Sequence, residues 1–184
     1  MGKSQLPRPF LYPRHLLEIF KLSTVDHHLP IVETRLWPTE AATDAFAQSL
    51  AAQADITHAV ITLHGDLGAG KTTLVRHLLR ALGVQGRVKS PTYAVVEPYE
   101  LPALNIWHFD FYRFSDPREW EDAGFRDIFA SPGLKLAEWP QNAGGLLPTP
   151  DLAIHLDTMH DDSRQATLTA ATALGRRLLT GLPA

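Results

Sequence analysis

Gly65 to Thr72 spell Gly-Asp-Leu-Gly-Ala-Gly-Lys-Thr, which fits the pattern Gly-x-x-x-x-Gly-Lys-Thr and suits a polyphosphate. Gly65 and Gly70 can adopt backbone angles that a side chain opposes, so the main chain can approach a ligand closely. Successive N–H groups of such a loop point inward and attract an anion, and the helix that follows adds the positive end of its dipole. Lys71 would place an ammonium at the β- and γ-phosphates, and Thr72 would offer a hydroxyl to Mg²⁺. The hydroxyl of Thr73 would lie within range of the α-phosphate.

The residues on either side of this loop favour a nucleotide site. An apolar run from His58 to Leu63 precedes the loop as a strand would, and leucines at helical spacing follow it from Leu74 to Leu82. A plain turn between a strand and a helix is the alternative explanation. The guanine-reading motif Asn-Lys-x-Asp does not occur in the sequence, so ATP is favoured over GTP.

Two acidic residues are candidates for the metal and water chemistry of a nucleotide site. Asp110 lies in an alternating run, Trp-His-Phe-Asp-Phe-Tyr, that places His108, Asp110 and Tyr112 on one face of a strand. Glu138 ends an apolar strand candidate, at the carboxyl end where α/β sheets bind ligands. Either carboxylate could hold Mg²⁺, directly or through water. The alternatives are a half-exposed edge strand for Asp110 and an exposed strand end for Glu138.

The segment Ser90-Pro91-Thr92-Tyr93 is a third candidate. Thr92 follows a proline that stiffens the main chain, and a hydroxyl there could sense the γ-phosphate, as nucleotide switches do. The alternative is an ordinary loop that leads into a strand. We therefore treat Thr92 as a candidate switch residue.

The elements that would position these candidates can also be predicted from the sequence. Strands and helices alternate early in the chain, and strands dominate later. A helix is predicted to begin after Thr39, which can cap free N–H groups, and its apolar positions recur every four residues. Strands are predicted at residues 58–63, 92–99, 104–111, 134–139, 152–157 and 165–170. Further helices are predicted at residues 74–82, from Asp116 to near Gly124, and at residues 174–179. The pattern predicts an α/β fold with a mixed sheet that is parallel around the glycine loop and antiparallel at one edge.

Composition limits the function further. The chain has 184 residues, 45% of them hydrophobic and 20% charged, enough for one well-buried core. A net charge of −3 leaves no broad basic surface for nucleic acid, so contact with RNA is expected only through a partner. Without cysteine there can be no disulfide, thiolate zinc site or thiol nucleophile, which fits a cytoplasmic protein. No apolar run approaches the length of a membrane span.

The first residues differ from the rest of the chain. Residues 1–33 are rich in proline and carry mixed charges, and they contain no clear signal-peptide core. We interpret residues 1–35 as an N-terminal extension of unassigned role and residues 36–184 as one ATPase domain. A start codon further along is an alternative. With no coiled-coil heptads, a monomer is the default expectation.

Taken in order, five motifs resemble the TsaE family, the small bacterial ATPases of tRNA threonylcarbamoyladenosine (t6A) synthesis. The motifs are GDLGAGKTT, VKSPTYAVVEPY, HFDFYR, DAGFRDIF and LAEWPQ. The glycine loop alone is widespread, but SPTY with HFDFYR and EWP is far more specific. The resemblance runs from about Leu36 to the C-terminus and omits the first 35 residues. Family members often carry Ile or Val where this chain has Ala137, a small change within an apolar strand.

The resemblance implies a three-layer P-loop NTPase fold with a mixed, mainly parallel central sheet. It also implies ATP and Mg²⁺ binding, slow ATPase activity, and work with the TsaB and TsaD proteins, which transfer threonylcarbamoyl to adenosine 37 of tRNA. The tRNA would be reached only through that complex.

The family's site residues carry over to matching positions of this chain. The expected ATP contacts are Asp66, Leu67, Gly68, Ala69, Gly70, Lys71, Thr72 and Thr73. The Mg²⁺ residues match Thr72 and Glu138, and the catalytic acid matches Asp110. Trp139 matches a tryptophan beside the glutamate, and Arg164 matches an arginine near the nucleotide. Leu36 and Trp37 are candidates to pack on adenine.

Two other functions compete with a partner-dependent ATPase. A small-molecule or nucleotide kinase of P-loop fold would need an acceptor pocket and usually a basic lid, and no compact lid insertion is visible. A binding module that uses ATP only as a conformational ligand would also turn over slowly alone. Stimulation by partners would separate it from the ATPase.

Overall fold

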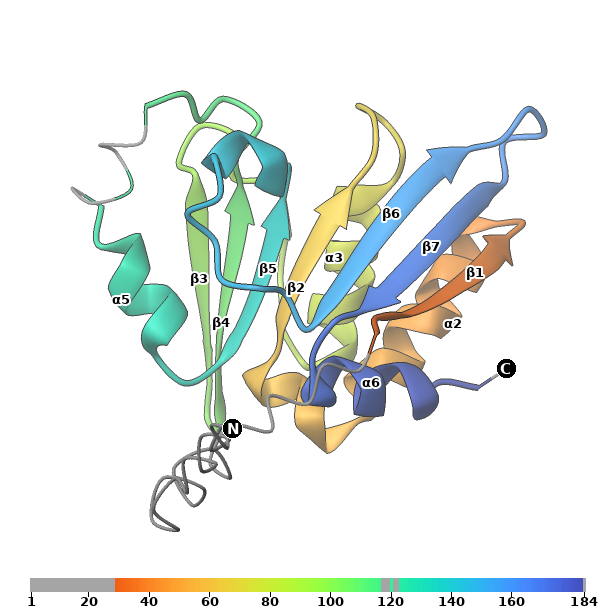
Figure 1. Ribbon diagram of the computed structural model, residues 1–184, viewed down its shortest axis with the longest axis horizontal. Coiled ribbons are helices and arrows are strands. Elements are labelled where there is room, and N and C mark those ends of the chain that lie inside the picture. The colour runs from red at the N-terminus through yellow and green to blue at the C-terminus, as the bar shows by residue number, and fades with distance from the viewer. Residues whose placement is uncertain (1–28, 117–119, 121–122, 184) are drawn as a thin grey trace, which may run out of the picture.

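The computed structural model describes residues 29–116, 120 and 123–183 as one seven-stranded sheet with helices packed against it (Figure 1). The strands occur in the spatial order β1-β7-β6-β2-β5-β4-β3. Their bounds are β1 Ile31–Trp37, β2 Val60–His64, β3 Val96–Leu101, β4 Leu104–Asp110, β5 Leu134–Glu138, β6 Leu152–Thr158 and β7 Arg164–Ala170.

The middle of the sheet is parallel and both of its sides are antiparallel. β6, β2, β5 and β4 pair in parallel, whereas β3 pairs with β4, and β7 with both β6 and β1, in the antiparallel sense. Five of the seven strands therefore point the same way, so the sheet is mixed and mainly parallel. Because parallel strands end at the same edge, the carboxyl ends of β2, β4 and β5 lie side by side there.

Helices α2 (Glu40–Ala51) and α3 (Lys71–Ala81) pack on each other and cover one face of the sheet (Figure 1). α5 (Phe125–Ala130) packs on the opposite face, beside β4 and β5, and α6 (Ala173–Thr180) packs against β6 and β7. Two short 3₁₀ helices, Ala54–His58 and Pro140–Ala143, complete the fold. Helices on both faces of the sheet make three layers.

The core has two parts, one on each side of the sheet. The larger part joins buried residues of α2 and α3, such as Leu50 and Leu79, to Leu136 of β5 and Ile154 of β6. The smaller part is aromatic, and its rings stack or meet edge to face. Its buried members are Phe109, Phe111, Phe114, Trp120, Phe125, Ala137 and Ala143. Together the two parts fix β4 and β5 on both faces.

β1 was not predicted. It begins at Ile31, so the sheet takes in residues that were assigned to the N-terminal extension. β1 is an edge strand on which only Trp37 is buried, and its hydrophobic pattern is correspondingly weak. The remaining extension, residues 1–28, lies outside the described residues.

Three other predictions need correction. β3 begins at Val96 and not at residue 92, because the backbone turns there and Val95 has a positive φ of 66°. The sheet is antiparallel at both sides, not at one. The helix predicted from Asp116 to Gly124 lies partly outside the described residues, and the helix that follows begins at Phe125. The other predicted strands, and the helices after Thr39, at 74–82 and at 174–179, are confirmed within a few residues.

Candidate functional site

The glycine loop joins the end of β2 to the start of α3, at the carboxyl edge of the sheet (Figure 1). Gly70 has a φ of 107° and is the last residue before α3, a conformation that an L side chain would strain. At Gly65, with φ of 125°, a side chain would also overlap the backbone oxygen of Leu156 on β6. The sequence therefore folds this segment into a tight loop whose backbone leads into the N-terminus of a helix.

Lys71 lies inside the loop. Its side chain is buried, and Nζ donates hydrogen bonds to the backbone oxygens of Gly65 at 2.7 Å and Asp66 at 2.8 Å. Nζ also lies 4.0 Å from the centre of the Trp139 ring. Burial lowers the pKa of the Lys71 ammonium, and the negative charge of Glu138 opposes this shift. The loop thus positions one cation at its centre.

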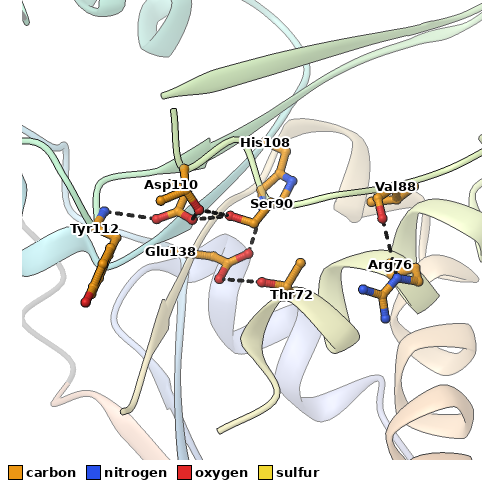
Figure 2. Close-up of polar contacts among 9 residues, drawn as sticks. Thr72, Arg76, Val88, Ser90, His108, Asp110, Tyr112 and Glu138 are labelled. Atoms are coloured by element: carbon orange, nitrogen blue, oxygen red, sulfur yellow. Dashed lines mark hydrogen bonds and ion pairs between the residues drawn. The ribbon is translucent and has the colours of Figure 1, made fainter. Parts of the chain in front are cut away.

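Glu138 ends β5 and is held from two sides (Figure 2). Its Oε2 accepts a hydrogen bond from Thr72 Oγ1 at 2.9 Å, and its Oε1 lies 2.9 Å from His108 Nε2. Only 2% of Glu138 is exposed, so the alternative of an exposed strand end is wrong. A buried carboxylate therefore contacts the first turn of α3 directly.

Asp110 ends β4 and lies beside Glu138 in the register of the sheet. Its Oδ2 accepts hydrogen bonds from Ser90 and from Thr92 Oγ1, the latter at 2.7 Å, and its Oδ1 accepts from the Tyr112 backbone N–H at 2.9 Å (Figure 2). Asp110 is 3% exposed and β4 lies between β5 and β3, so the half-exposed edge strand is wrong. The Ser90–Thr92 segment is attached to the acid and is not an ordinary loop.

Two cavities open on either side of the loop and share Gly68, Gly70 and Thr73. The first has a volume of about 240 Å³ and is also lined by Trp37, Thr39, Glu40, Thr43, Ala69, Leu156, Asp162 and Arg164. The second has a volume of about 270 Å³ and is also lined by Leu67, Lys71, Thr72, Ser90, Thr92, Asp110, Tyr112, Glu138 and Trp139. A ligand with two chemically different ends could occupy both cavities.

The structure brings most of the predicted site residues together, but not all. Arg164 begins β7, and its Nε donates to the backbone oxygen of Ala69 at 2.9 Å, which attaches that strand to the loop. Trp37 lines the first cavity, although its ring is buried against Phe46. Leu36 is exposed and does not line that cavity. Asp66 lines neither cavity and takes part through its backbone oxygen.

The donor atoms near α3 suit Mg²⁺. The side chains of Thr72, Glu138 and Asp110 supply oxygen only, which a hard cation prefers. Within the part of the chain that the structure describes, no group of three or more His, Asp or Glu side chains could hold a metal ion. Mg²⁺ is commonly held by one or two carboxylates together with substrate phosphates, so these residues fit a metal that arrives with a nucleotide.

Two contacts within the site were not predicted. Ser90 donates to Asp110, and the buried His108 ring contacts Glu138. The alternating pattern placed His108 on the same strand face as Asp110 but gave no partner for it. That partner depends on β4 lying next to β5, which no local pattern reveals.

A histidine next to the loop gives a pH prediction. The pKa of His64 is lowered from its usual 6.5, first by burial and then by repulsion from His155 and Lys71. The folded chain therefore binds fewer protons at His64 than the unfolded chain at mildly acidic pH, and stability rises with pH there. We expect the free energy of unfolding to fall as the pH drops below about 6.5, and His64→Gln to weaken that fall.

Urea unfolding of the full chain across this pH range measures the effect. His160→Gln makes the same change at an exposed histidine and is the matched control. A His64→Gln variant with the wild-type pH dependence would contradict the prediction.

The fold and site define the class of protein. A strand, a glycine loop and a helix at the carboxyl edge of a mainly parallel three-layer sheet form the P-loop NTPase fold. Residues 37–166 match the family model described as "Threonylcarbamoyl adenosine biosynthesis protein TsaE". The chain therefore belongs to the TsaE family, and its family works in t6A biosynthesis.

Similar proteins support this assignment. The chain is 46% identical over 121 residues to the tRNA threonylcarbamoyladenosine biosynthesis protein TsaE of Haemophilus influenzae, over 66% of this chain and 76% of that protein. It is 34% identical over 132 residues to TsaE of Rickettsia bellii, over 71% of this chain and 90% of that protein. The crystal structure of YdiB from Bacillus subtilis superposes with a TM-score of 0.68 at 29% identity, over 83% of this chain and 95% of that one.

Among the residues that the structure describes, none of the helices has both the length and the apolar character to cross a bilayer.

Proposed function

We propose that this chain binds ATP with Mg²⁺ at the glycine loop, hydrolyses it slowly, and supports t6A synthesis together with TsaB and TsaD. The observation that carries the proposal is the pair of cavities that share Gly68, Gly70 and Thr73. The second cavity contains the cation of Lys71 and both candidate carboxylates, as a triphosphate with a metal requires. The first cavity adds the apolar side chains of Trp37 and Leu156 to its polar groups, and this mixture suits a nucleoside.

The nucleoside end would lie between the loop and the start of β7. Trp37 and Leu156 offer apolar surface for a base, and Thr39 and Asp162 offer polar groups for a sugar. Arg164 lines the same cavity and is already bonded to the loop, so its guanidinium would lie close to the α-phosphate. The apolar and polar groups in this cavity match the two parts of adenosine.

The triphosphate end would meet the helix dipole, the loop amides and Lys71. The Nζ of Lys71 now donates to two loop carbonyls and would turn toward the β- and γ-phosphate oxygens. Bound Mg²⁺ would neutralise charge that develops on the phosphates, with Thr72 and Glu138 on its protein side. The contact between Thr72 and Glu138 supports assigning Glu138 to the metal.

Asp110 is the better candidate for the water. Its two oxygens accept from Ser90, Thr92 and the backbone of Tyr112, so its orientation is fixed beside the second cavity. A carboxylate there could accept a hydrogen bond from the water that attacks the γ-phosphate. Because Thr92 donates to the same acid, a change at Thr92 on binding of the γ-phosphate would alter Asp110. This supports the switch role proposed for Thr92.

The family and the charge of the chain both support a dependence on partner proteins. A net charge of −3 gives no basic surface that would hold tRNA directly, so the tRNA would be reached through the TsaB–TsaD complex. We propose a cytoplasmic monomer that docks on this complex. Slow turnover alone and faster turnover with partners would fit this arrangement.

Reconstitution tests the proposed function. The full chain is mixed with TsaB, TsaD, tRNA and threonylcarbamoyl-adenylate, with and without ATP, and modified tRNA is counted per TsaD. We expect more than one turnover only when this chain and ATP are both present. ADP and inorganic phosphate should form in equal amounts, because hydrolysis releases both products. A kinase would instead transfer the phosphate to an acceptor and release ADP alone. Equal multiple-turnover modification with and without this chain would contradict the proposal.

A further inference from the structure

His108 is a buried polar side chain that the proposed chemistry does not yet use. It lies on β4, between β5 and β3, and none of its surface is exposed. Its Nε2 lies 2.9 Å from Oε1 of Glu138 (Figure 2). Its Nδ1 is buried and has no hydrogen-bond partner among the described residues. The polar contact of this ring is therefore the one with Glu138.

The partner decides the direction of this hydrogen bond. A carboxylate oxygen can only accept, so Nε2 carries the hydrogen and donates it to Glu138. The opposite neutral tautomer would place two lone pairs 2.9 Å apart and leave an N–H without an acceptor at Nδ1. The geometry thus points to an Nε2–H donor aimed at the carboxylate.

The same carboxylate orients the hydroxyl of Thr72. A threonine hydroxyl has one hydrogen, and Thr72 gives it to Oε2 of Glu138 at 2.9 Å. Its oxygen lone pairs are then free to face the second cavity, where a cation would bind. The three side chains form a series in which His108 donates to Glu138, and Glu138 accepts from Thr72.

We propose that His108 is a positioning residue for the Mg²⁺ side of the site. By holding Oε1, it fixes the rotation of the Glu138 carboxylate, and the carboxylate in turn fixes the Thr72 hydroxyl. Removing a residue that orients a metal ligand in this way commonly lowers metal affinity by about 10- to 100-fold. This inference rests on the proposed binding of Mg²⁺ with a nucleotide.

A purely structural role predicts a different result. If His108 only fills space in the sheet, a phenylalanine of similar shape should preserve metal affinity and a flexible glutamine should not. If the hydrogen bond from Nε2–H to Glu138 is required, glutamine should preserve metal affinity, because its amide nitrogen reaches the Nε2 position. His108→Asn places its amide near the Nδ1 position, which has no partner, so this variant should lose metal affinity as His108→Phe does.

The test measures metal affinity directly. Mn²⁺, a spectroscopic substitute for Mg²⁺, is titrated by electron paramagnetic resonance into the full chain with saturating ADP. We expect His108→Phe and His108→Asn to weaken Mn²⁺ binding by about 10-fold, and His108→Gln to stay within about 3-fold of wild type. ADP binding without metal, measured by calorimetry, should not change in any variant, because the loop itself is untouched.

Several outcomes would overturn the inference. Mn²⁺ affinity within about 2-fold of wild type in a folded His108→Phe variant would do so, as would an equal loss in His108→Gln and His108→Phe. If His108→Phe does not fold, the comparison of His108→Gln with His108→Asn decides in the same way. Binding of neither ADP nor Mn²⁺–ADP by the wild-type chain would instead contradict the proposed function.

Discussion

Replacing Lys71 with alanine is expected to weaken binding of ATP with Mg²⁺ by at least about 100-fold. The side chain is buried in the loop, where its ammonium donates to both the Gly65 and Asp66 carbonyls. Removing it would leave phosphate charge without that partner, and losing one member of a buried charge pair costs about 3–5 kcal/mol. Since about 1.4 kcal/mol corresponds to a tenfold change in affinity, this cost exceeds two orders of magnitude.

Calorimetric titration of the full chain measures this effect. Arg80→Ala removes one positive charge from the exposed end of the same helix and is the matched control, with affinity expected to stay near wild type. Thermal unfolding should show that Lys71→Ala remains folded, because a buried cation whose pKa is lowered by burial contributes little to stability. An affinity within about 3-fold of wild type would contradict the role assigned to Lys71.

The second large effect is expected at the two carboxylates. Asp110→Ala and Glu138→Ala should each lower ATP turnover by about 100-fold or more, the contribution typical of a positioned acid or base. ATP binding should change far less, since neither side chain belongs to the loop. The two variants should also differ: Glu138→Ala should raise the Mg²⁺ concentration needed for activity, and Asp110→Ala should not.

Phosphate release under single-turnover conditions, with the partner complex present, measures both effects. Glu97→Ala, at an exposed carboxylate on β3, is the control for loss of negative charge nearby. An Asp110→Ala,Glu138→Ala double variant with wild-type turnover would refute both roles. A raised Mg²⁺ requirement in Asp110→Ala alone would reverse the two roles, with Asp110 assigned to the metal and Glu138 to the water.

The site was predictable where the signal lay in the local sequence. The glycine loop can be recognised from sequence because each of its residue types either permits the required backbone angles or binds phosphate. Glu138 was found because it ends an apolar strand candidate at the carboxyl end where α/β sheets bind ligands. Asp110 was found because polar and apolar residues alternate around it. The middle of the sheet followed from the same apolar runs.

What could not be predicted depends on contacts between distant segments. β1 shows little pattern because an edge strand buries few of its side chains, here only Trp37. The late start of β3 follows from the turn at Val95 and from the bonds of Ser90 and Thr92 to Asp110. The contact of His108 with Glu138 exists only because β4 and β5, well apart in the chain, are neighbours in the sheet.

A structure of the full chain with Mg²⁺ and a non-hydrolysable ATP analogue tests the central claim most directly. We predict the triphosphate in the second cavity against the loop amides and Lys71, the nucleoside in the first cavity, and the metal beside Thr72 and Glu138. An analogue bound elsewhere, or a loop that stays empty at a saturating concentration of the analogue, would contradict the account.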